Sequence, residues 1–481
     1  PPRPRLGGAW GGPRHISANT AASVFHACIN RLSYQAMTMQ PQIIAGLCPS
    51  DTIRSIAALA ESPCMLLSTD AAVIDISPVG LERMASVMAD TGASIVYADY
   101  RRLRPDGSVE NRPLTTWQKG SVRNDFRFGP AVLVNSEMFA HAAAETAPDL
   151  CAAAWYDTWL RMSRMAPIVH IPEMIYTARD TSDADDSETK HFSYVDPRNR
   201  NVQLEMEQVF TRHLQAIGAW LPAPAETPEF GDGFPVEASV IIPVRNRVDT
   251  IGDAIFSALD QTADFSFNVI VVDNHSTDGT TEVIRRLADD PRLIHIIPAE
   301  NGFGIGGCWN EALLSDRCGR FAVQLDSDDI YSSTHTLQTI VDCFHREQCA
   351  MVVGAYSLTD FNLAPIPPGI IDHREWTDSN GHNNLLRVNG LGAPRAFATA
   401  VARRTPFPDV SYGEDFAMGL RISRRYRIGR IFDVLYLCRR WNGNSDASLT
   451  IEKANRFDTY KDTLRTWEIE ARQQIIKTRR P

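Results

Sequence analysis

At 481 residues the chain is too long for one ordinary hydrophobic core, and this length predicts two or three domains. Its composition, 44% apolar and 22% charged, is typical of a soluble globular protein. The net charge of −10 and the lack of any basic run argue against a nucleic-acid partner. Nine cysteines without a C-x-x-C pair favour neither a disulfide framework nor a zinc site, and they predict a reducing, cytoplasmic location.

The ends and the apolar runs add three expectations. No apolar stretch approaches the roughly 18 residues that a membrane-spanning helix needs, so no transmembrane segment is predicted. The opening PPRPR is neither a signal peptide nor a typical start, and we expect a truncation at the amino end. Arginine carries nearly all of the positive charge, a bias that suggests a GC-rich bacterial gene.

Residues 1–221 are expected to form a first domain, because three of their sequence blocks recur in the same order later in the chain. The blocks are 93–102, 125–135 and 154–180, with counterparts at 350–360, 389–400 and 412–440. The third pair shares an L-R-x-S core, and the segment Leu67 to Asp70 has an acidic counterpart in the second half. Matches in register at this number of places predict a duplication.

Residues 222–235, PAPAETPEFGDGFP, are rich in proline, glycine and acids and are predicted to be a linker. In residues 236–450 that follow, short apolar runs alternate with helical stretches. The predicted strands are 238–244, 268–273, 293–297 and 320–325, and the predicted helices are 250–259, 280–288 and one that begins at 309. This alternation predicts an α/β domain with a mostly parallel sheet of right-handed βαβ units.

The most informative segment is QLDSDD, residues 324–329, whose three acids directly follow the predicted strand 320–325. Its three carboxylates should emerge at the carboxyl end of a buried strand, where open α/β sheets bind ligands. Like charges crowded at one strand end are unfavourable unless a cation neutralises them, and Mg²⁺ or Mn²⁺ suits such oxygens. A solvated acidic turn is the alternative for a bare D-x-D triplet, and the surrounding motifs favour the metal.

The last predicted element is a helix within residues 451–481. Its apolar residues recur at helical spacing and would form one stripe, which consists of Phe457, Tyr460, Leu464, Trp467 and Ala471. Because its polar face carries both signs of charge, we expect this amphipathic helix to pack on the domain rather than on a membrane.

Five motifs span residues 238–445: ASVIIPVRNR, VIVVDNHSTDGT, a glycine loop from Asn301 to Asn310, VQLDSDD, and the GED of 413–415. In kind and order they resemble those of a family 2 glycosyltransferase with a GT-A fold. The resemblance implies a Rossmann-like, mostly parallel sheet and a nucleoside-diphosphate sugar as donor. The first half resembles the acceptor side of the same fold without its nucleotide half, which makes it a partial, degenerate copy.

The resemblance implies that Asp273 accepts a hydrogen bond from the donor base, usually uracil, a task that suits an acceptor-only carboxylate. Pro243, Arg245 and Asn246 should line the same nucleotide pocket. Helix capping is the alternative role for Asp273.

In the glycine loop, Gly304 would permit close approach of the backbone to phosphate or ribose, and Asn310 would contact the donor. Plain turn formation is the alternative for such a loop. The family often has arginine directly before this asparagine, whereas this chain has Trp309, so the contact of that arginine is not expected here.

For the acid triplet, the resemblance implies that Asp326 binds the ribose and that Asp328 coordinates the metal bridging the donor phosphates. Asp326 is a second candidate ligand of this Mn²⁺ or Mg²⁺, and Asp329 would position the metal's waters. The ion would neutralise charge that builds on the leaving diphosphate.

By the same resemblance Asp415 is the general base that deprotonates the acceptor hydroxyl, and Glu414 orients the acceptor or a loop. A base opposite the leaving phosphate implies single displacement with inversion. An acidic pair that favours a helix dipole is the alternative. Arg440 would clamp the diphosphate. Many relatives carry a metal-binding histidine nearby; none follows His382 here, so Asn444 or water would replace it.

In the first half, Tyr156-Asp157 stands where Glu414-Asp415 would fall, and Ser68 stands where the first acid of the triplet would fall. An inactive copy that holds the acceptor glycan or mediates assembly is the favoured interpretation. A second active site is the alternative, and it would need a nucleotide half supplied by a missing amino-terminal part.

These features together predict a cytoplasmic, metal-dependent, inverting glycosyltransferase of bacterial polysaccharide biosynthesis. It would move a sugar from a nucleoside diphosphate, with UDP favoured, to a glycan or lipid-linked acceptor, with peripheral membrane contact. One alternative is a non-catalytic glycan-binding scaffold, against which the retained Asp273, Asp326, Asp328 and Asp415 argue. The other, a sugar-phosphate nucleotidyltransferase, would need G-x-G-x-R after the first strand, where this chain has PVRNR.

Overall fold

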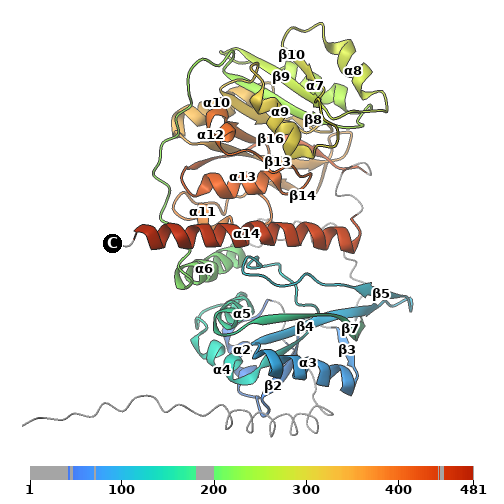
Figure 1. Cartoon of the computed structure of the whole chain (residues 1–481), viewed down its shortest axis with the longest axis vertical. Helices are drawn as coiled ribbons and strands as arrows, with labels where there is room; N and C mark the ends of the chain where they lie inside the picture. The colour runs from blue at the N-terminus through green and yellow to red at the C-terminus, as the bar shows by residue number, and fades with distance from the viewer. Residues whose placement is uncertain are drawn as a thin grey trace, which may run out of the picture.

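The structure is a computed structural model that describes residues 42–43, 47–69, 72–179, 200–441, 444 and 449–479. Two sheet-based halves lie on either side of one long helix, α14 (Ile451–Arg479) (Figure 1). Asp70, the predicted counterpart of the acid triplet, lies outside the described residues. Among the helices in these ranges, none combines the length and the apolar character needed to cross a bilayer.

The second half is built on a mixed sheet whose first strands are parallel. The strand order is β10 (Leu293–Ile296), β9 (Phe267–Asp273), β8 (Ala238–Val244), β11 (Phe321–Gln324), β15 (Arg395–Ala398), β13 (Met351–Thr359), β16 (Ile428–Arg439) and β12 (Ile330–Tyr331), with β14 (Pro365–Ile371) paired to β13. Strands β10, β9, β8 and β11 run parallel, and β15 is antiparallel to both β11 and β13. The predicted α/β fold is confirmed, with a sheet that is parallel from β10 to β11 and mixed beyond β11.

Helices connect these strands and cover the sheet. They are α7 (Ile251–Leu259), α8 (Thr280–Leu287), α9 (Ile305–Leu314), α10 (Thr336–Glu347), α11 (Gly381–Asn384), α12 (Thr399–Arg404) and α13 (Glu414–Ser423). Strand β9 is buried along its whole length, as expected for a strand covered on both faces. One boundary differs from the prediction: α9 begins at Ile305 rather than 309, so the second part of the glycine loop is helical.

The first half has its own sheet. Its order is β1 (Gln42–Ile43), β2 (Cys64–Ser68), β6 (Ala131–Asn135), β4 (Ile95–Leu103), β7 (Ile168–Arg179) and β3 (Val73–Ile76), with β5 (Val109–Arg112) paired to β4. Its helices are α2 (Ser50–Ala57), α3 (Pro78–Thr91), α4 (Ser136–Glu145), α5 (Ala154–Met165) and α6 (Arg200–Ala216).

The segment predicted to be a linker, residues 222–235, contacts the second half at several points. Glu226 forms a β-bridge with Tyr426 and an ion pair of 2.8 Å with Arg425. Phe230 packs edge-on against the ring of Phe321 in β11, with 5.0 Å between ring centroids. These contacts fix the path of the segment along the second half.

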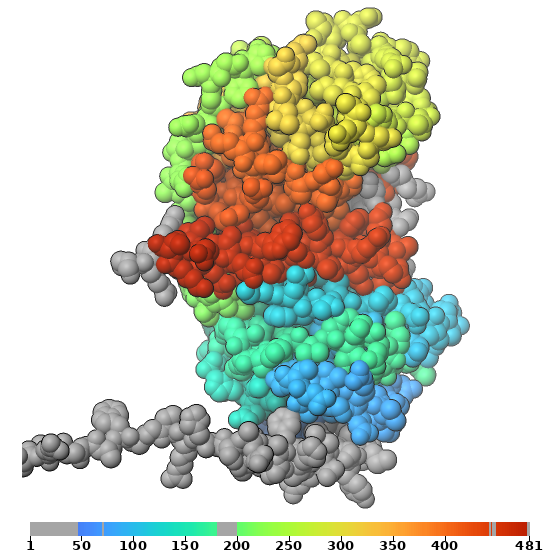
Figure 2. Space-filling view, in the orientation of Figure 1, coloured from blue at the N-terminus to red at the C-terminus, as the bar shows by residue number. Residues whose placement is uncertain are grey.

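Helix α14 forms a band between the two halves (Figure 2) and is not simply amphipathic. Trp467, which the predicted apolar stripe includes, is 58% exposed, whereas Asp462, Arg465 and Arg472 are fully buried. The expectation of one apolar face was wrong because both halves of the protein cover the helix. Its buried charges are paired with partners from these halves and along the helix.

Candidate active site

The carboxyl ends of β8, β9 and β11 lie at one edge of the sheet because these strands are parallel. Two contacts join the segments that follow them. Asn246, after β8, accepts a hydrogen bond of 2.8 Å from the Thr277 amide, which lies beyond β9. The Arg247 guanidinium lies 3.8 Å from the Asp328 carboxylate after β11. The predicted donor-side residues are therefore brought together.

The acid triplet follows β11 and is held by several donors. Asp326 accepts a hydrogen bond of 2.8 Å from the Gln324 side chain. Asp329 is buried and accepts one of 2.7 Å from the Arg439 amide. The Oδ2 atom of Asp328 lies 3.3 Å from the Trp441 indole nitrogen and 3.2 Å from the Asn444 amide nitrogen.

Burial raises the pKa values of the Asp326 and Asp329 carboxyls, and repulsion from Asp328 adds to both shifts. The three carboxylates therefore repel one another, and a bound cation would reduce that repulsion. Carboxylate oxygens of Asp326 and Asp328 suit a hard divalent cation. In the described part of the chain, no group of three His, Cys, Asp or Glu side chains is placed to hold an ion by itself. A cation here would need phosphate oxygens and water as further ligands.

Asp273 ends β9 as predicted, but its carboxylate is fully buried and already bonded. Oδ1 accepts a hydrogen bond of 2.9 Å from the Ser276 amide, and Oδ2 accepts one of 2.5 Å from the Thr281 hydroxyl. Burial alone would raise the pKa of Asp273, yet His295 and these hydrogen bonds lower it. The geometry favours the alternative role, in which Asp273 fixes the turn before α8.

The neighbouring Asn274 has the free acceptor that Asp273 lacks. Its side chain is 6% exposed, and its amide nitrogen donates a hydrogen bond of 2.7 Å to the Phe303 carbonyl. Its Oδ1 atom is buried without a hydrogen-bond partner among the described residues. An unpaired buried acceptor is costly, so it marks a place where a ligand donor fits. Sequence reasoning missed this residue; its position directly after the strand was the available signal.

The glycine loop packs against protein rather than lying open. A Cβ atom at Gly304 would overlap the Val410 backbone, and the Gly304 amide donates a hydrogen bond of 2.7 Å to Asp409. Asn310 bonds the backbone of Phe407 twice, donating at 2.9 Å and accepting at 3.0 Å. These contacts correct the prediction that Gly304 and Asn310 face the donor, because both residues hold the 407–410 segment.

Four other positions that the sequence analysis named differ in their burial. Trp309 is buried and stacks on Phe407 with 5.2 Å between ring centroids, so it fills the core. Pro243 is half-buried in β8, and Arg245 and Asn246 are exposed just beyond it. These last three residues remain at the donor-side edge, where they were predicted.

The acidic pair begins α13, and Arg395 of β15 lies beside it. Arg395 forms an ion pair of 2.8 Å with Asp415. Burial opposes ionisation of Asp415, but Arg395 and then Lys461 outweigh it and lower its pKa. Glu414 is 8% exposed; burial, followed by repulsion from Asp415, raises its pKa to about 8. Near neutral pH the pair thus separates into an ionised Asp415 and a largely protonated Glu414.

Arg395 also connects this pair to the acid triplet. Its backbone amide donates a hydrogen bond of 3.1 Å to the Gln324 side-chain oxygen, and the amide nitrogen of Gln324 donates to Asp326. The predicted donor end and the predicted base are therefore joined by a short series of hydrogen bonds. No sequence motif singles out Arg395, because its position beside Gln324 depends on the antiparallel pairing of β15 with β11.

Arg440 was predicted to lie near the diphosphate, but the hydrogen bonds to the acid triplet described here come from its neighbour Arg439. Its Nε atom donates a hydrogen bond of 2.6 Å to the Asp328 carbonyl, and its Nη1 atom lies 2.7 Å from Asp253. Its Nη2 atom is buried without a hydrogen-bond partner among the described residues. The Arg440 amide donates a hydrogen bond of 2.8 Å to the Thr359 carbonyl.

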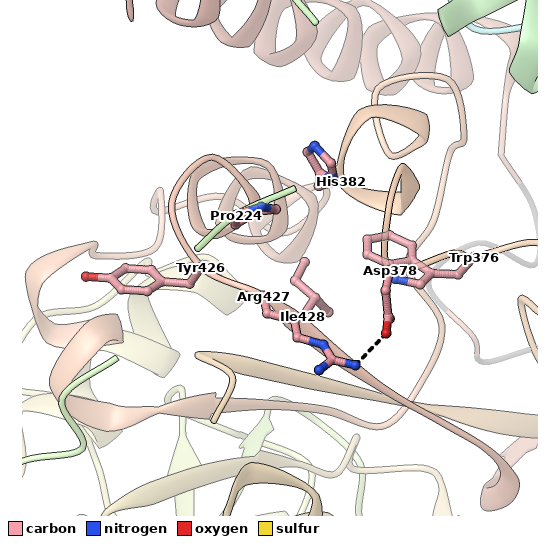
Figure 3. Close-up of a pocket in the computed structure, with 7 residues that line it drawn as sticks. All are labelled: Pro224, Trp376, Asp378, His382, Tyr426, Arg427 and Ile428. Atoms are coloured by element: carbon pink, nitrogen blue, oxygen red, sulfur yellow. Dashed lines mark hydrogen bonds and ion pairs between the residues drawn. The ribbon is translucent and has the colours of Figure 1, made fainter. Parts of the chain in front are cut away.

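A separate hollow lies on the second half, at the far end of α13 (Figure 3). It is lined by Pro224, Trp376, Asp378, His382, Tyr426, Arg427 and Ile428. Arg427 and Asp378 form an ion pair of 2.6 Å across it. None of the predicted site residues lines it, so the candidate active site does not extend there.

Comparisons with known proteins show the family of this chain. The family described as Glycosyl transferase family 2 matches residues 239–410. The Escherichia coli protein named UDP-Glc:alpha-D-GlcNAc-diphosphoundecaprenol beta-1,3-glucosyltransferase WfaP is 37% identical over 197 residues, covering 38% of this chain and 69% of WfaP. The Bacillus subtilis (strain 168) putative teichuronic acid biosynthesis glycosyltransferase TuaG is 33% identical over 128 residues, 27% of this chain and 50% of TuaG.

The chain thus spans about half the length of TuaG. Among solved structures, S. aureus TarS 1-349 in complex with UDP-GlcNAc is similar at 23% identity and a TM-score of 0.40, covering 50% of this chain and 70% of TarS. The family match falls on the residues that form the sheet edge described above, and the WfaP match covers more than two thirds of that relative. The chain belongs to glycosyl transferase family 2, and its second half has the α/β fold of the GT-A class.

Proposed function

We propose that this protein is a metal-dependent, inverting glycosyltransferase that transfers a sugar from a nucleoside diphosphate to a hydroxyl of a glycan or lipid-linked acceptor. One observation carries the proposal. Arg395 bonds Asp415 at 2.8 Å, and through Gln324 it is joined to Asp326. The residues that would hold a cation and diphosphate therefore lie close to an ionised carboxylate, an arrangement that a displacement reaction requires.

On the donor side, Asn274 is the residue that we propose to recognise the base. Its unpaired Oδ1 acceptor suits a ring N–H such as that of uracil, and WfaP is named for a UDP-sugar. Asp326 would bind the ribose or the cation, and Asp328 would bind the cation. When bound, a Mn²⁺ or Mg²⁺ ion supplies charge neutralisation at the diphosphate. Arg247 and Arg439 lie close enough to the triplet to add to it.

On the acceptor side, Asp415 is the proposed base. The acceptor O–H proton moves to its carboxylate while the acceptor oxygen bonds the anomeric carbon. The bond from that carbon to the phosphate oxygen breaks, and its electron pair leaves with the nucleoside diphosphate. Arg395 keeps Asp415 ionised, and Glu414, which holds its proton near neutral pH, can donate a hydrogen bond to the acceptor.

We further propose that the first half is an inactive partial copy and that the protein acts in the cytoplasm, with peripheral membrane contact where the acceptor is lipid-linked. The matching sheet order of the two halves supports the copy. The name of WfaP, which includes a diphosphoundecaprenol-linked sugar, supports a lipid-linked acceptor.

The test is a thermal-shift and calorimetric screen of UDP-, GDP- and dTDP-sugars with and without Mn²⁺ or Mg²⁺. A ligand that binds only the folded state stabilises it by mass action, so donor and metal dependence both appear in the melting temperature. We expect stabilisation by a UDP-sugar only with the cation, and its loss in Asn274→Ala. Stabilisation by no sugar nucleotide under either condition would leave the non-catalytic scaffold as the better account.

A further inference from the structure

Helix α14 lies beyond the residues that match the family, yet it borders the proposed base. Gly413, directly before Glu414, has a positive φ of 82°, a conformation that favours glycine. A Cβ atom placed on Gly413 would lie 3.4 Å from two ring carbons of Tyr460, which belongs to α14. The Tyr460 ring therefore lies against the first turn of α13.

Neighbouring residues hold this contact in place. Lys461 is 7% exposed, and its ammonium donates hydrogen bonds of 2.7 Å to the Asn389 carbonyl and 3.2 Å to the Tyr412 hydroxyl. The Tyr412 ring stacks on Phe457 of α14, with 4.0 Å between centroids and 9° between planes. The segment that leads to Glu414 and Asp415 is thus attached to α14 by a lysine and a pair of rings.

The chemistry of this corner points to a polar ligand with an apolar face. The Glu414 carboxyl is buried, and Tyr460 beside it on α14 is half-exposed. Burial and then the Glu414 charge raise the pKa of Tyr460, so its hydroxyl stays protonated and can both donate and accept. An aromatic ring beside a carboxyl and a phenol hydroxyl matches the C–H face and hydroxyls of a sugar.

We propose that Tyr460 of α14 forms one wall of the acceptor subsite and binds the saccharide ring whose hydroxyl is deprotonated by Asp415. This inference rests on the proposed glycosyl transfer and adds a substrate-binding residue to it. Tyr460 would contribute to the affinity and selection of the acceptor. The proposed donor site lies on the other side of Arg395, at the acid triplet.

The first half of the protein also bonds α14 close to Tyr460. The fully buried Asp462 accepts hydrogen bonds of 2.9 Å from the Ser121 hydroxyl and 3.2 Å from Arg123. Gln118 donates a hydrogen bond of 3.1 Å to the Thr459 carbonyl, one residue from Tyr460. The first half therefore seats the helix segment that carries the acceptor wall.

The experiment compares Tyr460→Ala, Tyr460→Phe and the control Trp467→Ala, which removes an aromatic ring from the exposed side of the same helix. Donor consumption is measured with UDP-glucose and UDP-N-acetylglucosamine in Mn²⁺, with and without the octyl glycosides of glucose, galactose and N-acetylglucosamine. Melting temperatures and circular dichroism establish that each variant is folded. Donor affinity is measured separately by calorimetry.

We expect Tyr460→Ala to raise the acceptor KM about tenfold or more, because a lost aromatic contact costs on the order of 1 kcal/mol or above. Donor affinity and acceptor-independent hydrolysis should stay within about twofold of wild type. Tyr460→Phe should fall between, since it keeps the ring and loses the hydroxyl, and Trp467→Ala should match wild type.

The outcomes separate the two proposals. A wild-type protein that neither binds nor consumes either donor would overturn the proposed function itself. Donor consumption that is normal in the wild type, with an unchanged acceptor KM in folded Tyr460→Ala, would overturn only the acceptor wall. Donor consumption that no glycoside accelerates would also overturn the wall, because a saccharide subsite must respond to a saccharide.

Discussion

Each half of the molecule has its own sheet, and the two sheets have matching strand orders but different residues at their strand ends. Strands β1, β2, β6, β4, β7 and β3 of the first half have the same order and relative directions as β8, β11, β15, β13, β16 and β12 of the second. Even the added strands correspond, because β5 pairs with β4 as β14 pairs with β13. In the described residues, strands equivalent to β9 and β10 occur only in the second half.

The acids at corresponding positions of the two halves, Asp157 and Asp415, have different partners. Asp157, the counterpart of Asp415, is 3% exposed and accepts a hydrogen bond of 3.2 Å from the Ala147 amide. It also pairs with Arg161 one helical turn away, at 3.2 Å. Asp415 instead pairs across the fold with Arg395, beside a second cluster of acids. Sheets of the same strand order thus hold a carboxylate at corresponding positions, while the residues packed around it decide which partners it has.

The largest expected effect comes from removing Asp328, the proposed cation ligand in the middle of the acid triplet. Asp328→Ala should reduce transfer by about a thousandfold, because a charge contact made to the reacting diphosphate is lost. Asp316→Ala, which removes an exposed acid before the opposite end of β11, should match wild type. Initial rates with UDP-sugar and Mn²⁺ provide the measurement. Near-normal rates in Asp328→Ala would mean that the two halves do not differ at this strand end in the proposed way.

A matched pair of amides compares the two copies directly. Asp415→Asn should keep donor binding but lower transfer by at least about a hundredfold, the usual contribution of a positioned base. Asp157→Asn should leave transfer within about twofold and lower the free energy of unfolding by about 1 kcal/mol, since it disturbs a buried hydrogen bond. Single-turnover rates and urea unfolding separate the two effects. Equal losses of rate in both variants would contradict the assignment of chemistry to the second half alone.

The contact between the halves can be broken at Arg123. This residue is 4% exposed and bonds Asp462 at 3.2 Å and Asp458 at 3.1 Å, both on α14. Arg123→Ala removes one of the two arginines that pair with the buried Asp462 and leaves Arg465 as the other. Because a buried ion pair is broken, the free energy of unfolding should fall by about 3 kcal/mol. Lys119→Ala, which removes an exposed pair with Glu470, should cost at most about 1 kcal/mol.

Urea unfolding followed by tryptophan fluorescence measures both of these changes. A cost for Arg123→Ala no larger than that for Lys119→Ala would show that the halves are not held together through this network. Separate transitions for the two halves in the variant would show that the network couples their unfolding.

The last expected effect is a pH dependence of stability, which appears only when the pH is varied. The pKa of Glu414 is about 8 in the folded protein against 4.5 ordinarily, so between these values only the unfolded state has lost the proton. Glu414 therefore lowers stability as the pH rises through this window, by an amount on the order of a few kcal/mol.

Glu414→Gln removes this titration, so its melting temperature should gain on wild type from about pH 5 to about pH 8 and then level off. The exposed Glu282→Gln should show no such trend. Melting curves across this pH range check both variants. A constant difference between Glu414→Gln and wild type would mean that Glu414 titrates normally.

The sequence by itself determined the first four strands of the second half, the helices between them, the sequence blocks that recur, and the acids that follow β11. Those features are local: periodicity reports burial of a strand, and residues directly after parallel strands must lie at one edge. For the same reason the predicted positions of Asp273, Asp326 and Asp328 at strand ends were correct, although Asp273 is used for the turn.

Only the tertiary structure decided which of these groups have free atoms and which neighbours they meet. The Asn274 amide nitrogen bonds the Phe303 carbonyl, while its side-chain oxygen has no partner among the described residues. The Asn310 side chain is bonded to the Phe407 backbone. Tyr460 lies against Gly413, 47 positions earlier, because both halves bond α14 and hold it in place. Such contacts depend on how distant segments pack, and no local pattern of residues encodes which donor will reach a given acceptor first.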